Sequence, residues 1–206
     1  MIIKSLEIFE PETYLYNKRE DRNNLFVSKY ISCFRKGIIL GQKPLYYLLK
    51  GSYAKSIDKI NILTEDERIG YKSILILLNQ IKRDTGEFSI YITPHIFTKL
   101  VHELRETIKR PDYFKGIMNL FIEPFSYIKE EELKKEEIIS FNSFKNMYCG
   151  ISETAIILLK NKMEGISIID SSSNKIPELA GDNYLFVDFP TLIQTIKEYE
   201  RRESFT

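Results

Sequence analysis

Residues 37–51 read GIILGQKPLYYLLKG, and this stretch decides the fold. The short apolar run from Ile38 to Leu40, set between two glycines, is typical of a buried β-strand. Pro44 then opens a second apolar run that ends at Gly51, and proline in the first turn with glycine just past the last turn is typical of a helix. A strand followed at once by a helix predicts the first half of a β-α-β unit.

The same alternation continues along the chain. A capping box at 64–67 predicts a long helix that ends at Gly86. Short apolar runs predict three more strands, at 89–92, 166–169 and 184–187. The stretches around them predict helices at 95–108, from 111 to Pro124, 151–163, around 176–180 and 191–200. This order predicts a three-layer α/β fold with a mainly parallel sheet of four to five strands flanked by helices.

The charge run KEEELKKEE at 129–137 could be mistaken for a functional cluster. We interpret it as the solvated face of a helix, with i, i+4 ion pairs such as Glu130–Lys134 and Glu131–Lys135. A helical charge run of this kind carries no chemistry of its own.

The composition suits one domain, since the chain has 206 residues, of which 43% are hydrophobic. We assign residues 37–206 to that domain and 1–36 to an N-terminal extension of uncertain fold, because KREDRNN at 18–24 shows no periodicity. The 30 basic and 29 acidic residues give a net charge of +1, which does not favour a dedicated nucleic-acid binder.

No apolar run approaches the ~20 residues of a membrane span, and the N-terminus shows no signal-peptide pattern. We therefore expect a cytoplasmic protein that does not bind membranes. Cys33 and Cys149 show no metal-binding spacing, and we expect them to be free thiols.

In a parallel sheet, the functional crevice lies beyond the carboxyl ends of the strands. The residues that end the predicted strands are Gly41, Thr93, Asp170 and Asp188. We expect these four positions to border the functional site.

Several short sequence motifs resemble those of one family of nucleases and occur in the same order along the chain. These motifs are Ile38 to Leu49, ITPHIFT at 92–98, GISETAI at 150–156 and the strand at 166–169. Over residues 37–195 they resemble the PIN-domain ribonucleases, most closely a bacterial and archaeal subgroup with a long insert after the first helix. The resemblance implies a set of carboxylates that hold Mg²⁺ or Mn²⁺, which activate a water for attack at phosphorus.

This sequence departs from that pattern at most of its acidic positions. Gly41 stands where the family has its first aspartate, and Lys99 replaces the second acid. Glu153 keeps the third acid with one extra methylene. The fourth aspartate aligns with Ser172, while Asp170 takes the place of a threonine. Glu153 and Asp170 are therefore the remaining candidates for catalysis and metal binding, and Gly41, Lys99 and Ser172 are vestigial positions.

The positive charge of Lys99 suggests a substitute for the metal ion that the family's acids hold. A cluster of carboxylates is stable only when a cation offsets their repulsion. We expect the Lys99 ammonium to pair with Glu153 or Asp170 at the old metal position. The alternatives remain that Glu153 is an ordinary first-turn glutamate, that Asp170 starts a turn, and that Lys43 and Lys99 bind a phosphate.

Three functions follow from this interpretation. The favoured one is a non-enzymatic PIN-like protein, without a cofactor, that acts by binding a protein or RNA, as a monomer or a homodimer. The alternative is an active Mg²⁺- or Mn²⁺-dependent endoribonuclease of the toxin type, restrained by an antitoxin-like protein. Its reduced acid set would be Glu153 and Asp170 with Asp182 or Asp188. In the third, the resemblance is accidental and the chain is another α/β module.

Overall fold

The computed structural model describes Phe34 and residues 36–86, 89–121, 128–144, 150–163, 166–171, Ile176 and 186–204. Apart from Phe34 and Lys36, the extension expected at 1–36 lies outside the described residues. So do Ser172, Asp182 and, apart from Ile176, the helix expected at 176–180.

The centre of the fold is one five-stranded sheet in which every pair of neighbours is parallel, in the order β3-β2-β1-β4-β5. The strands are β1 (Ile38–Leu40), β2 (Ile90–Ile92), β3 (Ile128–Glu130), β4 (Ser167–Asp170) and β5 (Phe186–Asp188). The prediction of an α/β fold with a mainly parallel sheet of four to five strands is confirmed.

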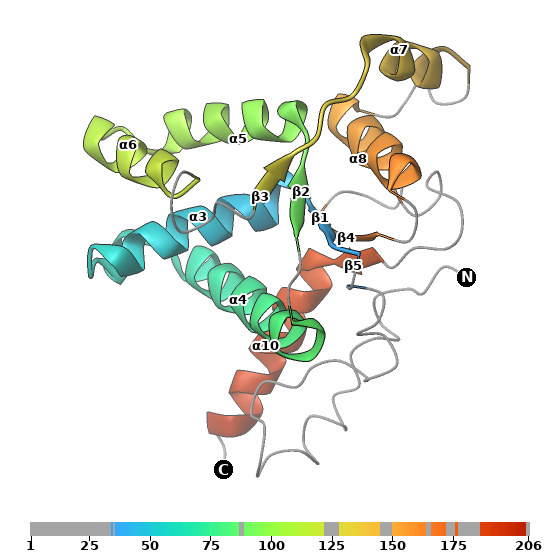
Figure 1. Ribbon diagram of the computed structural model, residues 1–206. Helices are drawn as coiled ribbons and strands as arrows, with labels where there is room; N and C mark the ends of the chain where they lie inside the picture. The colour runs from blue at the N-terminus through green and yellow to red at the C-terminus, as the bar shows by residue number, and fades with distance from the viewer. Residues whose placement is uncertain are drawn as a thin grey trace.

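Helices cover the sheet on both sides, and Figure 1 shows α3, α4 and α5 on one side of the strands with α8 on the other. The helices are α3 (Gln42–Ser56), α4 (Glu65–Thr85), α5 (Pro94–Thr107), α6 (Pro111–Asn119), α7 (Lys135–Phe144), α8 (Ile151–Lys162) and α10 (Phe189–Ser204), with the short 3-10 helix η3 (Ile60–Ile62). Helix α3 packs against α4 and α5, α10 packs against α4, and α7 packs against α8.

Local sequence signals set most of these boundaries. The capping box at Thr64 forms as expected, with the Glu67 amide donating to the Thr64 hydroxyl and the Thr64 amide donating to Glu67. Helix α4 ends at Gly86, whose φ of 79° suits glycine. None of the described helices combines the length and the apolar character needed to cross a membrane.

The predicted end of the first helix is wrong, because α3 continues through Gly51 to Ser56. A Cβ at Gly51 would overlap the ring of Tyr71 and lie 2.7 Å from its Cβ. Gly51 is therefore not a terminator. Its missing side chain lets α3 and α4 approach closely.

The helical interpretation of 129–137 is also wrong for its first half. Ile128–Glu130 forms the edge strand β3, and the Glu131 amide extends its pairing by donating to the Ile92 carbonyl at 2.9 Å. Helix α7 begins only at Lys135. The exposed charges suit an edge strand, where one side of the ladder faces solvent. Glu131 forms its ion pair with Lys162 of α8, at 3.4 Å.

The strand order reverses at β1. The chain proceeds from β1 to β2 and β3 on one side, then returns to place β4 and β5 on the other side of β1. Ligands of open α/β sheets bind at such a switch point, beyond the carboxyl ends of the strands. Here the switch point lies between Gly41 and Asp170, where the Gly41 amide donates to the Ile169 carbonyl at 2.8 Å.

Candidate ligand-binding crevice

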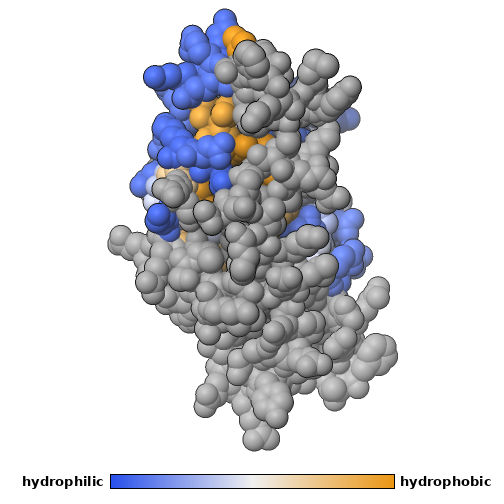
Figure 2. Space-filling view, turned by 90° about the vertical axis from the view of Figure 1, so that its right-hand side faces the viewer, coloured by the Kyte–Doolittle hydropathy of each residue, from blue (hydrophilic) through white to orange (hydrophobic). Residues whose placement is uncertain are grey.

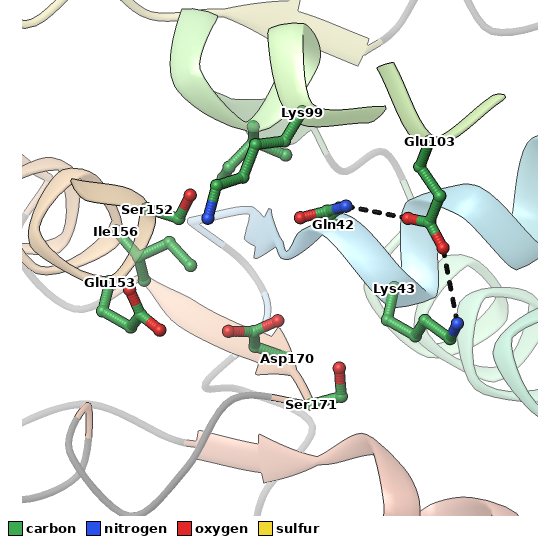
Figure 3. Close-up of a pocket in the computed structure, with 10 residues that line it drawn as sticks. Gln42, Lys43, Lys99, Glu103, Ser152, Glu153, Ile156, Asp170 and Ser171 are labelled. Carbon is green, nitrogen blue, oxygen red and sulfur yellow. Dashed lines mark hydrogen bonds and ion pairs between the residues drawn. The ribbon is translucent and has the colours of Figure 1, made fainter. Parts of the chain in front are cut away.

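A pocket of about 280 Å³ lies at this switch point. Figure 3 shows its walls: the first turn of α3, the inner face of α5, the first turn of α8 and the end of β4. Its lining residues are Gln42, Lys43, Ile96, Lys99, Glu103, Ser152, Glu153, Ile156, Asp170 and Ser171. The two candidate acids predicted from the sequence, Glu153 and Asp170, thus lie in one pocket together with Lys99.

Asp170 occupies the space above Gly41. A Cβ built on Gly41 would overlap Oδ1 and Cγ of Asp170 and lie 2.9 Å from its Cβ. Asp170 itself is buried, with 5% of its surface exposed. A side chain at position 41 and the aspartate at position 170 therefore exclude each other, and the acid beside this switch point comes from the end of β4.

Glu103 is a pocket residue that the sequence reasoning missed. Its carboxylate accepts a 2.7 Å hydrogen bond from Gln42 Nε2 and lies 3.5 Å from Lys43 Nζ, so it joins α5 to the first turn of α3. Glu103 lies one helical turn after Lys99, and an i, i+4 check along α5 would have found it.

The first turn of α8 contributes two polar atoms that lack partners. Ser152 Oγ and Glu153 Oε2 are both buried, and neither has a hydrogen-bond partner in the structure as described. The helix begins at Ile151, and its N-cap residue, Gly150, has no side chain that could cap it. Glu153 Oε2 folds back over Gly150, where it would contact a Cβ at that position. This placement at a helix N-terminus is favourable for a carboxylate.

Lys99 points into the pocket from α5 (Figure 3). No ion pair within the described part of the chain joins its ammonium to Glu153 or Asp170, so the expected direct pairing is wrong. Lys99 is exposed to solvent. Holding a long solvated side chain in one geometry offsets most of what an exposed ion pair gains.

Two of the four residues expected at the carboxyl ends of the strands cap helices. Asp188 accepts hydrogen bonds from the Thr191 amide, at 2.9 Å, and from the Thr191 hydroxyl, and so caps α10. The Thr93 hydroxyl accepts from the Ile96 amide at 3.3 Å and caps α5. Neither Asp188 nor Thr93 is among the residues that line the pocket.

Among the described residues, the acids do not form a cluster that fits a divalent metal. Across the described ranges, no three His, Cys, Asp or Glu side chains are grouped so that they could hold a metal ion. Mg²⁺ requires oxygen ligands in near-octahedral geometry, and Lys99 adds a positive charge to the pocket that Glu153 and Asp170 line.

Comparisons with known proteins identify no family. No family model matches the chain, and no solved structure matches it. The chain is 26% identical over 196 residues to the DNA mismatch repair protein MutL of Clostridium perfringens (strain 13 / Type A). This similarity covers 89% of the chain but 29% of that protein, so the chain spans less than a third of the length of the relative it matches.

Proposed function

We propose that this chain is a cytoplasmic PIN-like domain that has lost metal-dependent ribonuclease activity and acts by binding a partner at the crevice. The observation that carries the proposal is the mutual exclusion of Asp170 and any side chain at Gly41. The acid that the resemblance requires at the end of β1 has no room there. Lys99 supports the same conclusion, because its positive charge points into the pocket.

The charges of the pocket favour a protein partner over RNA. Three carboxylates, Glu103, Glu153 and Asp170, face two lysines, Lys43 and Lys99, so a phosphate backbone would meet net repulsion. Apolar surface borders the α8 wall: Ile151 is 54% exposed, and Figure 2 shows hydrophobic residues among hydrophilic ones on this side of the molecule. Apolar surface with a polar rim is typical of protein interfaces.

An RNA-cleavage assay with Mg²⁺ or Mn²⁺ tests the loss of activity. We expect no metal-dependent cleavage by the natural chain. Lys99→Glu restores an acid at the second position, and Lys109→Glu makes the same charge change at an exposed position outside the pocket. Cleavage by the natural chain that EDTA abolishes would contradict the proposal.

The binding half of the proposal is tested with labelled single-stranded oligonucleotides. Because the chain is similar to part of a DNA mismatch repair protein, DNA is included beside RNA. We expect no binding of either that depends on Lys99. Oligonucleotide binding that Lys99→Met removes and Lys109→Met retains would make a nucleic acid the partner instead of a protein.

A second candidate function is the active Mg²⁺- or Mn²⁺-dependent endoribonuclease. The observation that favours it is the buried, unpartnered Glu153 Oε2 in the same pocket as Asp170, since a cation would satisfy that oxygen. Glu153→Gln keeps the shape of the side chain and removes its charge. Metal-dependent cleavage that this variant abolishes would establish the second candidate.

A further inference from the structure

A second pocket, of about 320 Å³, lies between η3 and α4 and shares no lining residue with the crevice. Most of its lining is apolar. Tyr71, Leu75 and Ile76 of α4 line it while they pack against the hydrophobic core, and each stays half-buried. Ile60 of η3 also lines it, with 49% of its surface exposed. A concave and mainly apolar pocket of this size is typical of sites for small ligands.

The lining residues on α4 form one stripe along the helix. They are Arg68, Tyr71, Lys72, Leu75, Ile76 and Asn79. Their spacing of three and four residues keeps them on one face. At 1.5 Å per residue the stripe is about 16 Å long. An apolar stripe of this length favours an extended hydrocarbon chain over a compact ring.

Both charged residues that line this pocket are basic. Arg68 and Lys72 lie one turn apart on α4, and both are exposed. Glu67, the acid next to Arg68 in the chain, pairs with Lys50 instead. No ion pair within the described part of the chain involves the Arg68 guanidinium. Like charges one turn apart repel each other, so the pocket is complementary to an anionic group bound near both.

We infer that the pocket between η3 and α4 binds a free carboxylic acid with an extended hydrocarbon chain, as a medium-chain fatty acid has. The carboxylate pairs with Arg68, whose planar guanidinium matches its two oxygens, and Lys72 adds to the attraction. The hydrocarbon chain lies along Tyr71, Leu75 and Ile76. This inference goes beyond the proposed partner binding, because it concerns a different pocket.

The test is a titration of the full chain with octanoate, followed by calorimetry and by amide chemical shifts. 1-Octanol lacks the charge, and octylammonium reverses it. We expect each to bind at least about tenfold more weakly than octanoate, as loss of a hydrogen bond between charged groups predicts. From hexanoate to decanoate, each added CH₂ should tighten binding by up to about fourfold, because it buries more apolar surface.

Two variants at exposed positions separate the contributions of charge and apolar surface. Arg68→Met removes the advantage of octanoate over 1-octanol. The matched control is Arg105→Met, at an exposed position of α5 outside the pocket, and it keeps that advantage. Ile60→Ser weakens octanoate and 1-octanol alike and keeps the preference for the acid.

The inference is overturned if neither octanoate nor decanoate binds at millimolar concentration. It is also overturned if octanoate binds equally well to Arg68→Met and Ile60→Ser, because the ligand then lies elsewhere.

Two further results would overturn it by assigning the pocket to another occupant. One is a dimer in sedimentation that Ile60→Ser dissociates, which would make a second copy of the chain the occupant. The other is Arg68-dependent binding to phosphatidylglycerol vesicles without binding of octanoate, which would indicate a membrane surface. None of these results alters the metal-dependent cleavage assay, which tests the proposed function separately.

Discussion

Two charged clusters lie along α3, one against α4 and the other in the crevice beside α5 and α8, and they differ in how completely they are paired. Between α3 and α4, Lys50 Nζ lies 2.6 Å from Glu67 Oε1, and the Tyr46 hydroxyl donates to the same oxygen at 2.8 Å. The side chains of Lys50 and Glu67 are only 13% and 12% exposed. Every charge in this cluster has a partner of opposite sign or a hydrogen bond.

The pKa shifts follow from that pairing. Burial alone would raise the pKa of the Glu67 carboxyl, but hydrogen bonds from Lys50, the Thr64 amide and Tyr46 outweigh it, so the pKa lies below its ordinary value. Burial raises the pKa of the Tyr46 hydroxyl well above its ordinary value, and the charge of Glu67 adds to the shift.

The crevice has a similar composition but leaves Lys99, Ser152 Oγ and Glu153 Oε2 without partners among the described residues. A fully paired, buried cluster stabilises the fold, whereas an exposed lysine without an ion pair, such as Lys99, contributes little to stability. This contrast predicts that substitutions in the Lys50–Glu67 cluster lower the free energy of unfolding strongly, and that substitutions in the crevice lower it little.

Removing Lys50 should have the largest effect on stability. Lys50→Met leaves the Glu67 carboxylate buried without its ion-pair partner, and we expect a loss of about 3 kcal/mol in the free energy of unfolding. The matched control is Lys43→Met, because Lys43 is 43% exposed in its pair with Glu103, and it should change stability by less than about 0.5 kcal/mol. Urea denaturation measures both, and equal losses would remove the contrast.

The second-largest loss of stability is expected when a side chain at position 41 is forced against Asp170. Gly41→Ala forces its new methyl group against Asp170, and we expect it to lower the free energy of unfolding by about 2 kcal/mol. In the double variant with Asp170→Ala the loss should be smaller than the sum of the single losses by more than about 0.5 kcal/mol. Additive losses would show that the two side chains do not compete for the same space.

The acid dependence of stability sharpens the comparison further. Because the folded pKa of Glu67 is lowered from 4.5, its stabilisation is present above that pH and is lost as the pH falls through the folded pKa. The stability difference between the natural chain and Glu67→Gln should therefore shrink from about pH 6 to about pH 3. A constant difference across that range would contradict the pairing of Glu67.

The smallest stability effect is expected in the crevice. Lys99→Met should change the free energy of unfolding by less than about 0.5 kcal/mol, because Lys99 is exposed and forms no ion pair with the described residues. Thermal denaturation beside the Lys50→Met variant gives the comparison directly. A loss as large as that of Lys50→Met would mean that Lys99 has a structural role.

The sequence predicted the central sheet well because four of its strands are short apolar runs. The sequence did not predict β3, because two exposed charges in an edge strand give the same pattern as the solvated face of a helix. Gly51 was misread as a helix end, because its close approach to Tyr71 depends on a contact between α3 and α4. Both errors arise from tertiary contacts that no local pattern contains.

The site was only partly predictable. Glu153 and Asp170 were found from their positions in the motifs, and the structure brings them to one pocket. Glu103 was missed because its contact with Gln42 requires the first turn of α3 to lie opposite α5. Lys99 was placed correctly at the crevice, but its pairing was not, because sequence cannot tell a solvated lysine from a paired one.

Calorimetric titration with Mn²⁺ tests most directly the proposal that the crevice does not bind catalytic metals. The comparison includes the natural chain, Lys99→Glu and Glu153→Gln. We predict no binding heat at millimolar Mn²⁺ for the natural chain and for Glu153→Gln, and weak binding for Lys99→Glu, in which the lysine becomes an acid. Binding by the natural chain that disappears in Glu153→Gln would contradict the account and establish a live metal site.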